Sequence, residues 1–232
     1  MTVGVDDDGS ARTVLRDKDI RLALAAAIGR QYRDSDYLLV PEVDIICGIP
    51  GRIDALLVAD RIWGFEIKSD LDTLRRLPRQ LEAYGPVLER GTLVAAARHI
   101  EGVEKLLPPW WGIWVVIDRA GTAALTVHRS GKTNPGLSLH AVAEFIPREG
   151  LVRHLRTQGV RGYSKYSVYE LRDQVVRLHS RREFLSLARW VMSSRGDWRY
   201  RALWPGDTVG RSLAQSGAMA SNASCACPVC QL

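Results

Sequence analysis

The stretch GRIDALLVADRIWGFEIKSD, residues 51–70, predicts two short strands joined by a turn. Apolar residues dominate both strands, yet the strands also contain Asp54, Glu66 and Lys68. Charged side chains are seldom buried unless they are paired or functional. The three charges therefore raise the question of a site built on this hairpin.

Strand alternation separates the side chains of the hairpin into two faces. On the second strand it sends Phe65 and its apolar neighbours into the core and places Glu66 and Lys68 on the other face. On the first strand it groups Ile53 with the other odd-numbered apolar residues and leaves Asp54 on the even face. The charged residues of both strands are thus expected to share one face.

A hairpin folded symmetrically about Asp60 would set Asp54 directly opposite Glu66, with Cβ atoms roughly 5 Å apart. Two carboxylates this close either share a proton or bind a cation. A shift of one residue in the register would instead send them to opposite faces. The expected register therefore decides whether the two acids form a site.

A hard divalent ion such as Mg²⁺, for which Mn²⁺ is the expected substitute, binds carboxylate oxygens and keeps several waters. An ammonium group beside it, here that of Lys68, could orient a water or stabilise charge developing on a phosphate. These are the parts needed for phosphodiester hydrolysis. The alternative is an ordinary solvated ion pair between Glu66 and Lys68, which is the usual interpretation of an isolated E-x-K.

The rest of the first half predicts a mixed α/β fold in the order α-β-β-β-α-β-α-β. Leucines at helical spacing indicate a helix within 70–90, and Pro78 is expected to kink it or to remove its first turn. The expected helices cover 16–32, 70–90 and 102–107, and the expected strands cover 36–47, 52–58, 62–68, 91–99, 110–118 and 122–129.

Composition divides the chain into a predicted α/β core at 13–135, a basic and mainly helical extension at 136–205, and two disordered ends at 1–12 and 206–232. Residues 161–204 hold ten Lys or Arg and four Asp or Glu, which equals the net charge of +6 of the whole chain. Such a region favours a polyanionic partner, although a well-solvated surface is nearly as good an explanation.

Localisation is expected to be cytoplasmic, with no membrane association. No apolar run approaches the roughly 20 residues that cross a bilayer. The first residues do not resemble a signal peptide. The four cysteines, three of them at the C-terminal end, give no disulfide framework.

The pattern RID-(x)11-EIK, residues 52–68, resembles the PD-(D/E)XK nuclease superfamily, with Ile53-Asp54 in place of Pro-Asp. QLEAY, residues 80–84, resembles the Q-x-x-x-Y element of the RecB-type branch. Further segments between about 14 and 118 are similar to a small bacterial family named after a myxobacterial open reading frame with the prefix "sce". The resemblance implies a restriction-endonuclease-like core of α-β-β-β-α-β order with a mixed sheet.

The resemblance also implies roles for individual residues. Catalysis would fall to Asp54, Glu66 and Lys68, and Gln80 and Tyr84 would support the site. The metal ligands would be Asp54 and Glu66 with Glu42 as a further contact, Asp44 being the alternative to Glu42 and a plain surface acid an equal possibility for either. Contacts to nucleic acid are expected from Arg75, Arg76 and Arg79, for which a solvated helix face is equally plausible.

The sequence therefore predicts a Mg²⁺-dependent nuclease, preferably a DNA endonuclease, whose basic extension grips the phosphate backbone. The alternative is a nucleic-acid-binding module of the same fold that cleaves nothing, and a third hypothesis is a scaffold without nucleic-acid contact. The sequence does not decide whether the substrate is DNA or RNA. It also leaves the oligomeric state open, a homodimer included.

Overall fold

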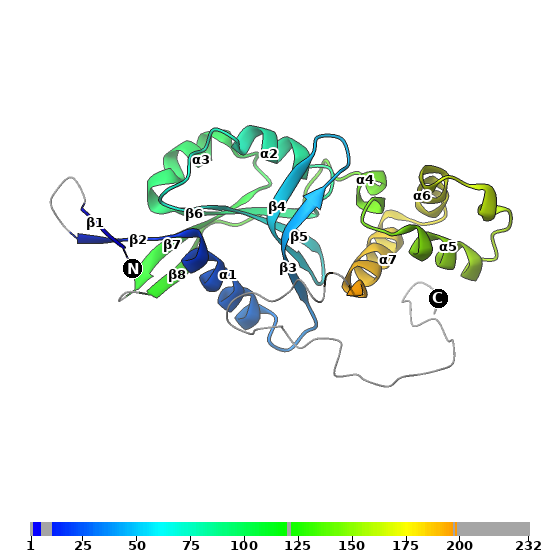
Figure 1. Cartoon of the computed structure of the whole chain (residues 1–232), viewed down its shortest axis with the longest axis horizontal. Helices are drawn as coiled ribbons and strands as arrows, with labels where there is room; N and C mark the ends of the chain where they lie inside the picture. Colours follow the sequence, from blue (N-terminus) through cyan, green and yellow to red (C-terminus); the bar gives the residue numbers. More distant parts are fainter. Residues whose placement is uncertain (1, 6–10, 120–121, 197, 199–232) are drawn as a thin grey trace.

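The computed structural model describes residues 2–5, 11–119, 122–196 and 198 (Figure 1). Its centre is a six-stranded sheet of order β3-β4-β5-β6-β7-β8. β3, β4 and β5 pair antiparallel, β5, β6 and β7 pair parallel, and β8 closes the sheet antiparallel to β7. The strands are β1 Thr2–Val5, β2 Ala11–Val14, β3 Leu38–Ile45, β4 Gly51–Val58, β5 Ile62–Lys68, β6 Arg90–Ala96, β7 Gly112–Arg119 and β8 Thr122–Arg129.

The predicted order of elements is confirmed, and the fold is mixed α/β. The helices are α1 Asp17–Gln31, α2 Leu77–Tyr84, α3 Ile100–Leu106, α4 Leu139–Ala143, α5 Arg148–Thr157, α6 Val168–Arg177 and α7 Arg181–Ser193, with short 3₁₀ turns at Ala97–His99 and Tyr163–Lys165. Residues 1–12, expected to be disordered, include β1, which pairs with β2 outside the main sheet. The tail at 206–232, with its three cysteines, lies outside the described residues.

Helices cover both faces of the sheet (Figure 1). α1 packs on one face through Ile20, Leu24 and Ile28, which share a core with Phe65 of β5. The opposite face packs against α2, α3 and the C-terminal helices, which contribute to a second and larger core. All seven residues of β5 are therefore buried, Glu66 and Lys68 included.

Two predicted helical segments differ from the structure. One helix begins later than expected and one segment is divided, and in both cases the new start carries a helix-start signal in the sequence. The helix expected over 70–90 begins at Leu77, with Pro78 in its first turn, where a missing N–H costs nothing. Within the predicted helical extension, residues 167–195, which also have a helical pattern in the sequence, form two helices, because Ser180 caps α7 through reciprocal hydrogen bonds with Glu183. α7 is tied to the sheet by an ion pair of 2.8 Å between Arg189 and Glu89.

The β3–β4 ladder is interrupted at one position. Pairing is regular on either side of it, but Glu42 and Asp54, which would face each other in the same register, do not pair. Glu42 has a positive φ of 52°, a conformation that is uncommon for any residue other than glycine. Ile53 consequently packs in the larger core with Leu56, so the expectation that Ile53 shares the face of Ala55 is wrong.

No helix among the described residues is long and apolar enough to cross a bilayer.

The packing of β6 on Trp111 gives the first prediction. A Cβ atom added at Gly91 would lie 2.6 Å from the fully buried indole of Trp111. Gly91→Ala should therefore lower the free energy of unfolding by about 1–3 kcal/mol through overpacking. Gly196→Ala, where no described atom beyond the chain neighbours lies within 4 Å of the new methyl group, is the control in urea denaturation. Equal midpoints for the two variants would contradict this packing.

Candidate functional site

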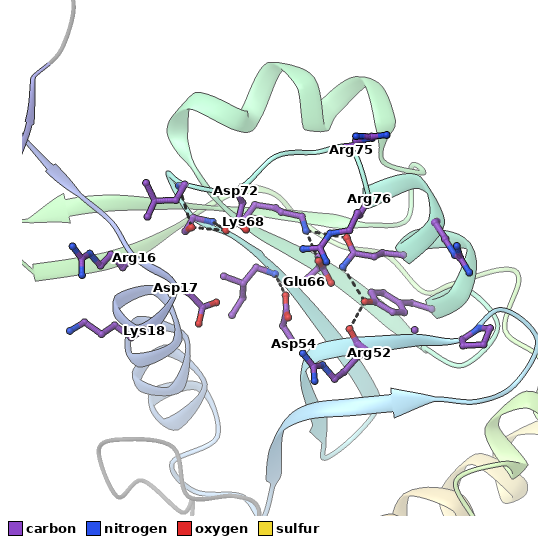
Figure 2. Close-up of a pocket in the computed structure, with 18 residues that line it drawn as sticks. Arg16, Asp17, Lys18, Arg52, Asp54, Glu66, Lys68, Asp72, Arg75 and Arg76 are labelled. Carbon is purple, nitrogen blue, oxygen red and sulfur yellow. Dashed lines mark hydrogen bonds and ion pairs between the residues drawn. The ribbon is translucent and has the colours of Figure 1, made fainter. Parts of the chain in front are cut away.

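A cleft of about 1010 Å³ opens between the start of α1, the start of β4, the end of β5 and one side of α2 (Figure 2). It brings together eight of the residues singled out in the sequence, and Glu42 is not among its lining residues. The eight are Asp54, Glu66, Lys68, Arg75, Arg76, Arg79, Gln80 and Tyr84. Its lining carries seven Lys or Arg side chains and four Asp or Glu side chains, so the cleft is basic.

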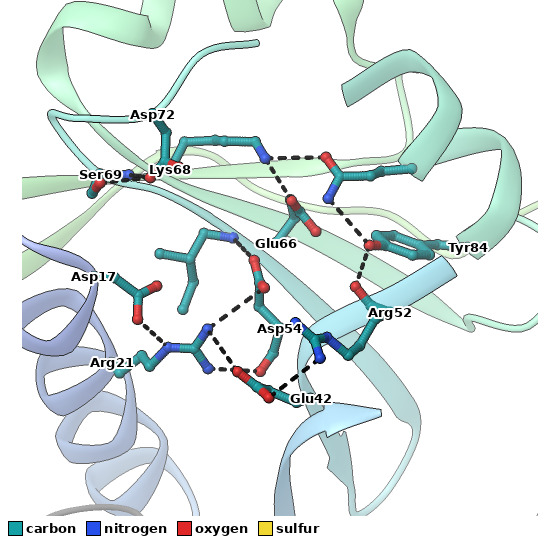
Figure 3. A network of polar contacts seen from close by, with 12 residues as sticks. Asp17, Arg21, Glu42, Arg52, Asp54, Glu66, Lys68, Ser69, Asp72 and Tyr84 are labelled. Carbon is teal, nitrogen blue, oxygen red and sulfur yellow. Dashed lines mark hydrogen bonds and ion pairs between the residues drawn. The ribbon is translucent and has the colours of Figure 1, made fainter. Parts of the chain in front are cut away.

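Lys68 is held by a chain of hydrogen bonds (Figure 3). Its Nζ donates to Glu66 Oε1 at 2.7 Å and to Gln80 Oε1 at 3.0 Å. Gln80 Nε2 lies 3.4 Å from the Tyr84 hydroxyl, which donates in turn to the carbonyl oxygen of Arg52. Because Gln80 and Tyr84 are one helical turn apart, α2 presents both to β5 from the same side.

Glu66 has an unusual environment for a carboxylate. The side chain is 1% exposed, and its Oε2 is buried without a hydrogen-bond partner, although the Tyr84 hydroxyl is near enough to influence its pKa. Burial first, and the nearby Asp54 carboxylate second, raise the pKa of Glu66 from 4.5 to about 7. Lys68 opposes this rise without cancelling it.

Asp54 reaches the same cleft from β4. The observed pairs of the β4–β5 ladder, from Val58–Ile62 to Ala55–Phe65, confirm the register centred on Asp60. The ladder ends one step before Asp54, whose Oδ2 instead accepts a hydrogen bond of 2.8 Å from the backbone N–H of Ile67. Burial raises the pKa of the Asp54 carboxyl group despite this hydrogen bond.

Arg21 on α1 is a site residue that sequence reasoning missed. Its Nη1 donates to the backbone carbonyl of Asp54 at 3.1 Å, and its Nη2 lies 3.5 Å from Asp54 Oδ1. The guanidinium is itself bound by Asp17, one turn earlier on the helix. The i, i+4 spacing of Asp17 and Arg21 is visible in the sequence and indicates that the two side chains meet on one side of the helix. It does not indicate that this side faces β4.

Glu42 and Asp44 are both exposed and do not join the two acids of the cleft. The Glu42 carboxylate lies 4.0 Å from Arg21 and 3.7 Å from Arg52. Asp44 lines a separate hollow of about 260 Å³ beside Phe145. Neither Glu42 nor Asp44 therefore adds a third carboxylate to Asp54 and Glu66.

The turn that follows β5 forms one lip of the cleft, and it too was missed. Ser69 donates from both N and Oγ to Asp72 Oδ2, and Asp70 Oδ2 accepts from the N–H of Leu15 at 2.9 Å. Leu71, between the two acids, also lines the cleft. The turn thus fixes the chain directly after Lys68.

The acids of the cleft offer oxygen donors to a metal ion. Among the described residues, no three His, Cys, Asp or Glu side chains lie close enough together to hold one. Asp54 and Glu66 are two of the four acids that line the cleft, and Glu66 Oε2 is an unsatisfied buried acceptor. Two carboxylate ligands suit Mg²⁺ or Mn²⁺, which keep several waters, and do not suit a structural zinc site.

The raised pKa of Glu66 has a consequence for stability. A carboxyl group whose pKa rises on folding contributes stability below its unfolded pKa, here 4.5, and loses that contribution as the pH rises to about 7. In EDTA, the stability of the wild type relative to Glu66→Gln should fall by up to roughly 3 kcal/mol between pH 4.5 and 8. Urea denaturation of both proteins across this range measures it, and a pH-independent difference would show that Glu66 has an ordinary pKa.

Comparison with known proteins places the chain in a family. The family described as Bacteriophage P4 protein cII matches residues 12–195. Protein cII of Enterobacteria phage P4 is 23% identical over 147 residues, a match that covers 63% of this chain and 55% of that protein's length. No solved structure matches the chain. The match to 12–195 includes every residue of the cleft, and the chain belongs to the Bacteriophage P4 protein cII family.

Proposed function

We propose that this protein is a metal-dependent nuclease that hydrolyses phosphodiester bonds, with DNA as the preferred substrate. The observation that carries the proposal is the buried Glu66–Lys68 pair at the base of a basic cleft, with Glu66 Oε2 unsatisfied and Asp54 beside it. The element order α1-β3-β4-β5-α2-β6 is the one expected of a restriction-endonuclease-like core, which we include in the proposal.

Asp54 and Glu66 would hold the metal ion through one carboxylate each. Bound there, Mg²⁺ would supply charge neutralisation at the phosphate and an acidified water. Glu66 has a hydrogen bond from Lys68 on one oxygen and none on the other, so the second oxygen remains available to a cation. Burial raises the pKa of both acids although Arg21 lies near Asp54 and Lys68 near Glu66, and a cation bound between them would favour their charged forms.

Lys68 would stabilise the negative charge that develops on the attacked phosphate. Its Nζ is fixed by Glu66 and Gln80, which reduces the reorganisation needed during the reaction. An ammonium group has three protons, so one remains to donate to a phosphate oxygen or to a water. Tyr84 would position Gln80 and through it the amine.

The phosphates flanking the site would be bound by Arg75, Arg76 and Arg79, which are exposed on the cleft wall. The basic extension has a smaller part in this arrangement than its charge suggests. None of its described residues lines the cleft, and Arg172, Arg177 and Arg189 form ion pairs with acids of this chain. That it also grips nucleic acid stays a prediction.

Nicking of supercoiled plasmid tests the proposal. With Mg²⁺ or Mn²⁺ the wild type should convert supercoiled plasmid to open circles, and EDTA should abolish the conversion. Lys68→Ala and Asp54→Ala should each lower the rate by about 100-fold or more, because each removes a group that acts on the transition state. Lys105→Ala, an exposed lysine on α3 paired with Glu101, is the matched control and should cut normally.

Two outcomes would contradict the proposal. Cleavage that survives in both site variants would place the activity elsewhere or in a contaminant. Salt-sensitive DNA binding without cutting in either metal would favour a binding module of this fold that cleaves nothing.

A further inference from the structure

The turn at residues 69–72 is held more firmly than a surface turn requires. Within it, Leu71 N donates to Ser69 Oγ and Asp72 N donates to the carbonyl of Ser69. From outside it, Arg98 Nη2 donates to the carbonyl of Asp72 at 2.8 Å, and His99 Nε2 lies 2.9 Å from the carbonyl oxygen of Ser69. The turn is therefore held from outside by Leu15, which lies between β2 and α1, and by the 3₁₀ turn after β6.

All the polar side chains of this turn are used to hold it, and its apolar side chain is not buried. Ser69 and Asp70 are buried, whereas Leu71 is 72% exposed. Among the described residues, Leu71 is the one large exposed hydrophobic side chain that lines the cleft. A lone exposed leucine needs no explanation on an ordinary surface. Here it is fixed three residues from Lys68, in a cleft with an excess of positive charge.

The chemistry of the cleft limits what Leu71 can contact. The arginines select a polyanion, and the only broad apolar surfaces of a nucleic acid are the faces of its bases. In an uninterrupted duplex those faces are covered by stacking, and the grooves offer mainly polar edges. An aliphatic side chain gains most by packing on a base that has left the stack, and leucine is among the residues that proteins insert in this way.

We propose that Leu71 packs on the face of an unstacked nucleobase next to the phosphate held at Lys68, so that the cleft prefers strands with unpaired bases to uninterrupted duplex. This rests on the nucleic-acid substrate of the proposed function, and it does not require cleavage. Fixing the turn in advance lowers the entropic cost of the contact, because neither the backbone nor the neighbouring acids must reorder.

Binding without divalent metal tests this inference separately from catalysis. Fluorescence anisotropy of labelled 20-nucleotide single strands and blunt duplexes is measured in EDTA with the full chain. The wild type should bind the single strand more tightly. Leu71→Ser should weaken single-strand binding about tenfold, the loss expected for an apolar contact of this size, and change duplex binding less than twofold. Leu71→Met should bind as the wild type does.

Leu178→Ser, an exposed leucine after α6 and outside the cleft, is the matched control and should change neither affinity. Thermal melting establishes that both serine variants are folded. A Leu71→Ser variant that binds both strands like the wild type, or loses both equally, would overturn the inference. If Leu71→Ser loses the preference for single strands and the wild type cuts no DNA, the inference is retained and the proposed nuclease activity is rejected. If the wild type cuts DNA and Leu71→Ser binds both strands as the wild type does, the nuclease activity is retained and the inference is rejected.

Discussion

The ion pair between Glu66 and Lys68 is the constraint on which the site depends. The two groups lie 2.7 Å apart on a strand that is buried along its whole length, with side chains only 1% and 3% exposed. Removing two charges from water costs more than a single contact returns unless further hydrogen bonds are made. Lys68 makes one to Gln80, but Glu66 keeps an unsatisfied oxygen, so stability alone does not explain this pair.

The interruption in the β3–β4 ladder explains how Asp54 joins that pair. A regular ladder would place Glu42 opposite Asp54 and leave two carboxylates facing each other across the strands. Instead, Glu42 and Asp54 do not pair in the ladder. Arg21 donates to the backbone carbonyl of Asp54, and the Asp54 side chain accepts from the N–H of Ile67. The acid is thereby fixed to β5, next to Glu66, and Glu42 turns toward arginines at the rim.

The hairpin and the site could be predicted because both depend on local spacing. A turn centred on Asp60 sets the register, and the same register puts Asp54 and Glu66 on one cleft. The separation of Glu42 from Asp54 and Glu66 could not be predicted, because it depends on the positive φ of Glu42, a conformation that glutamate rarely adopts. Arg21 was missed because its contact joins a helix to a strand more than thirty residues away. The start of α7 was readable from the Ser180–Glu183 capping pattern, which the basic composition of the stretch obscured.

Binding of Mn²⁺ to the metal-free protein, followed by calorimetry at pH 8, tests most directly whether Asp54 and Glu66 share one cation. We expect one site in the wild type, affinity lowered more than tenfold in Asp54→Asn, and unchanged affinity in Asp44→Asn, whose carboxylate lies in the other hollow. The same affinity in Asp54→Asn as in the wild type, or no binding by the wild type, would contradict the account.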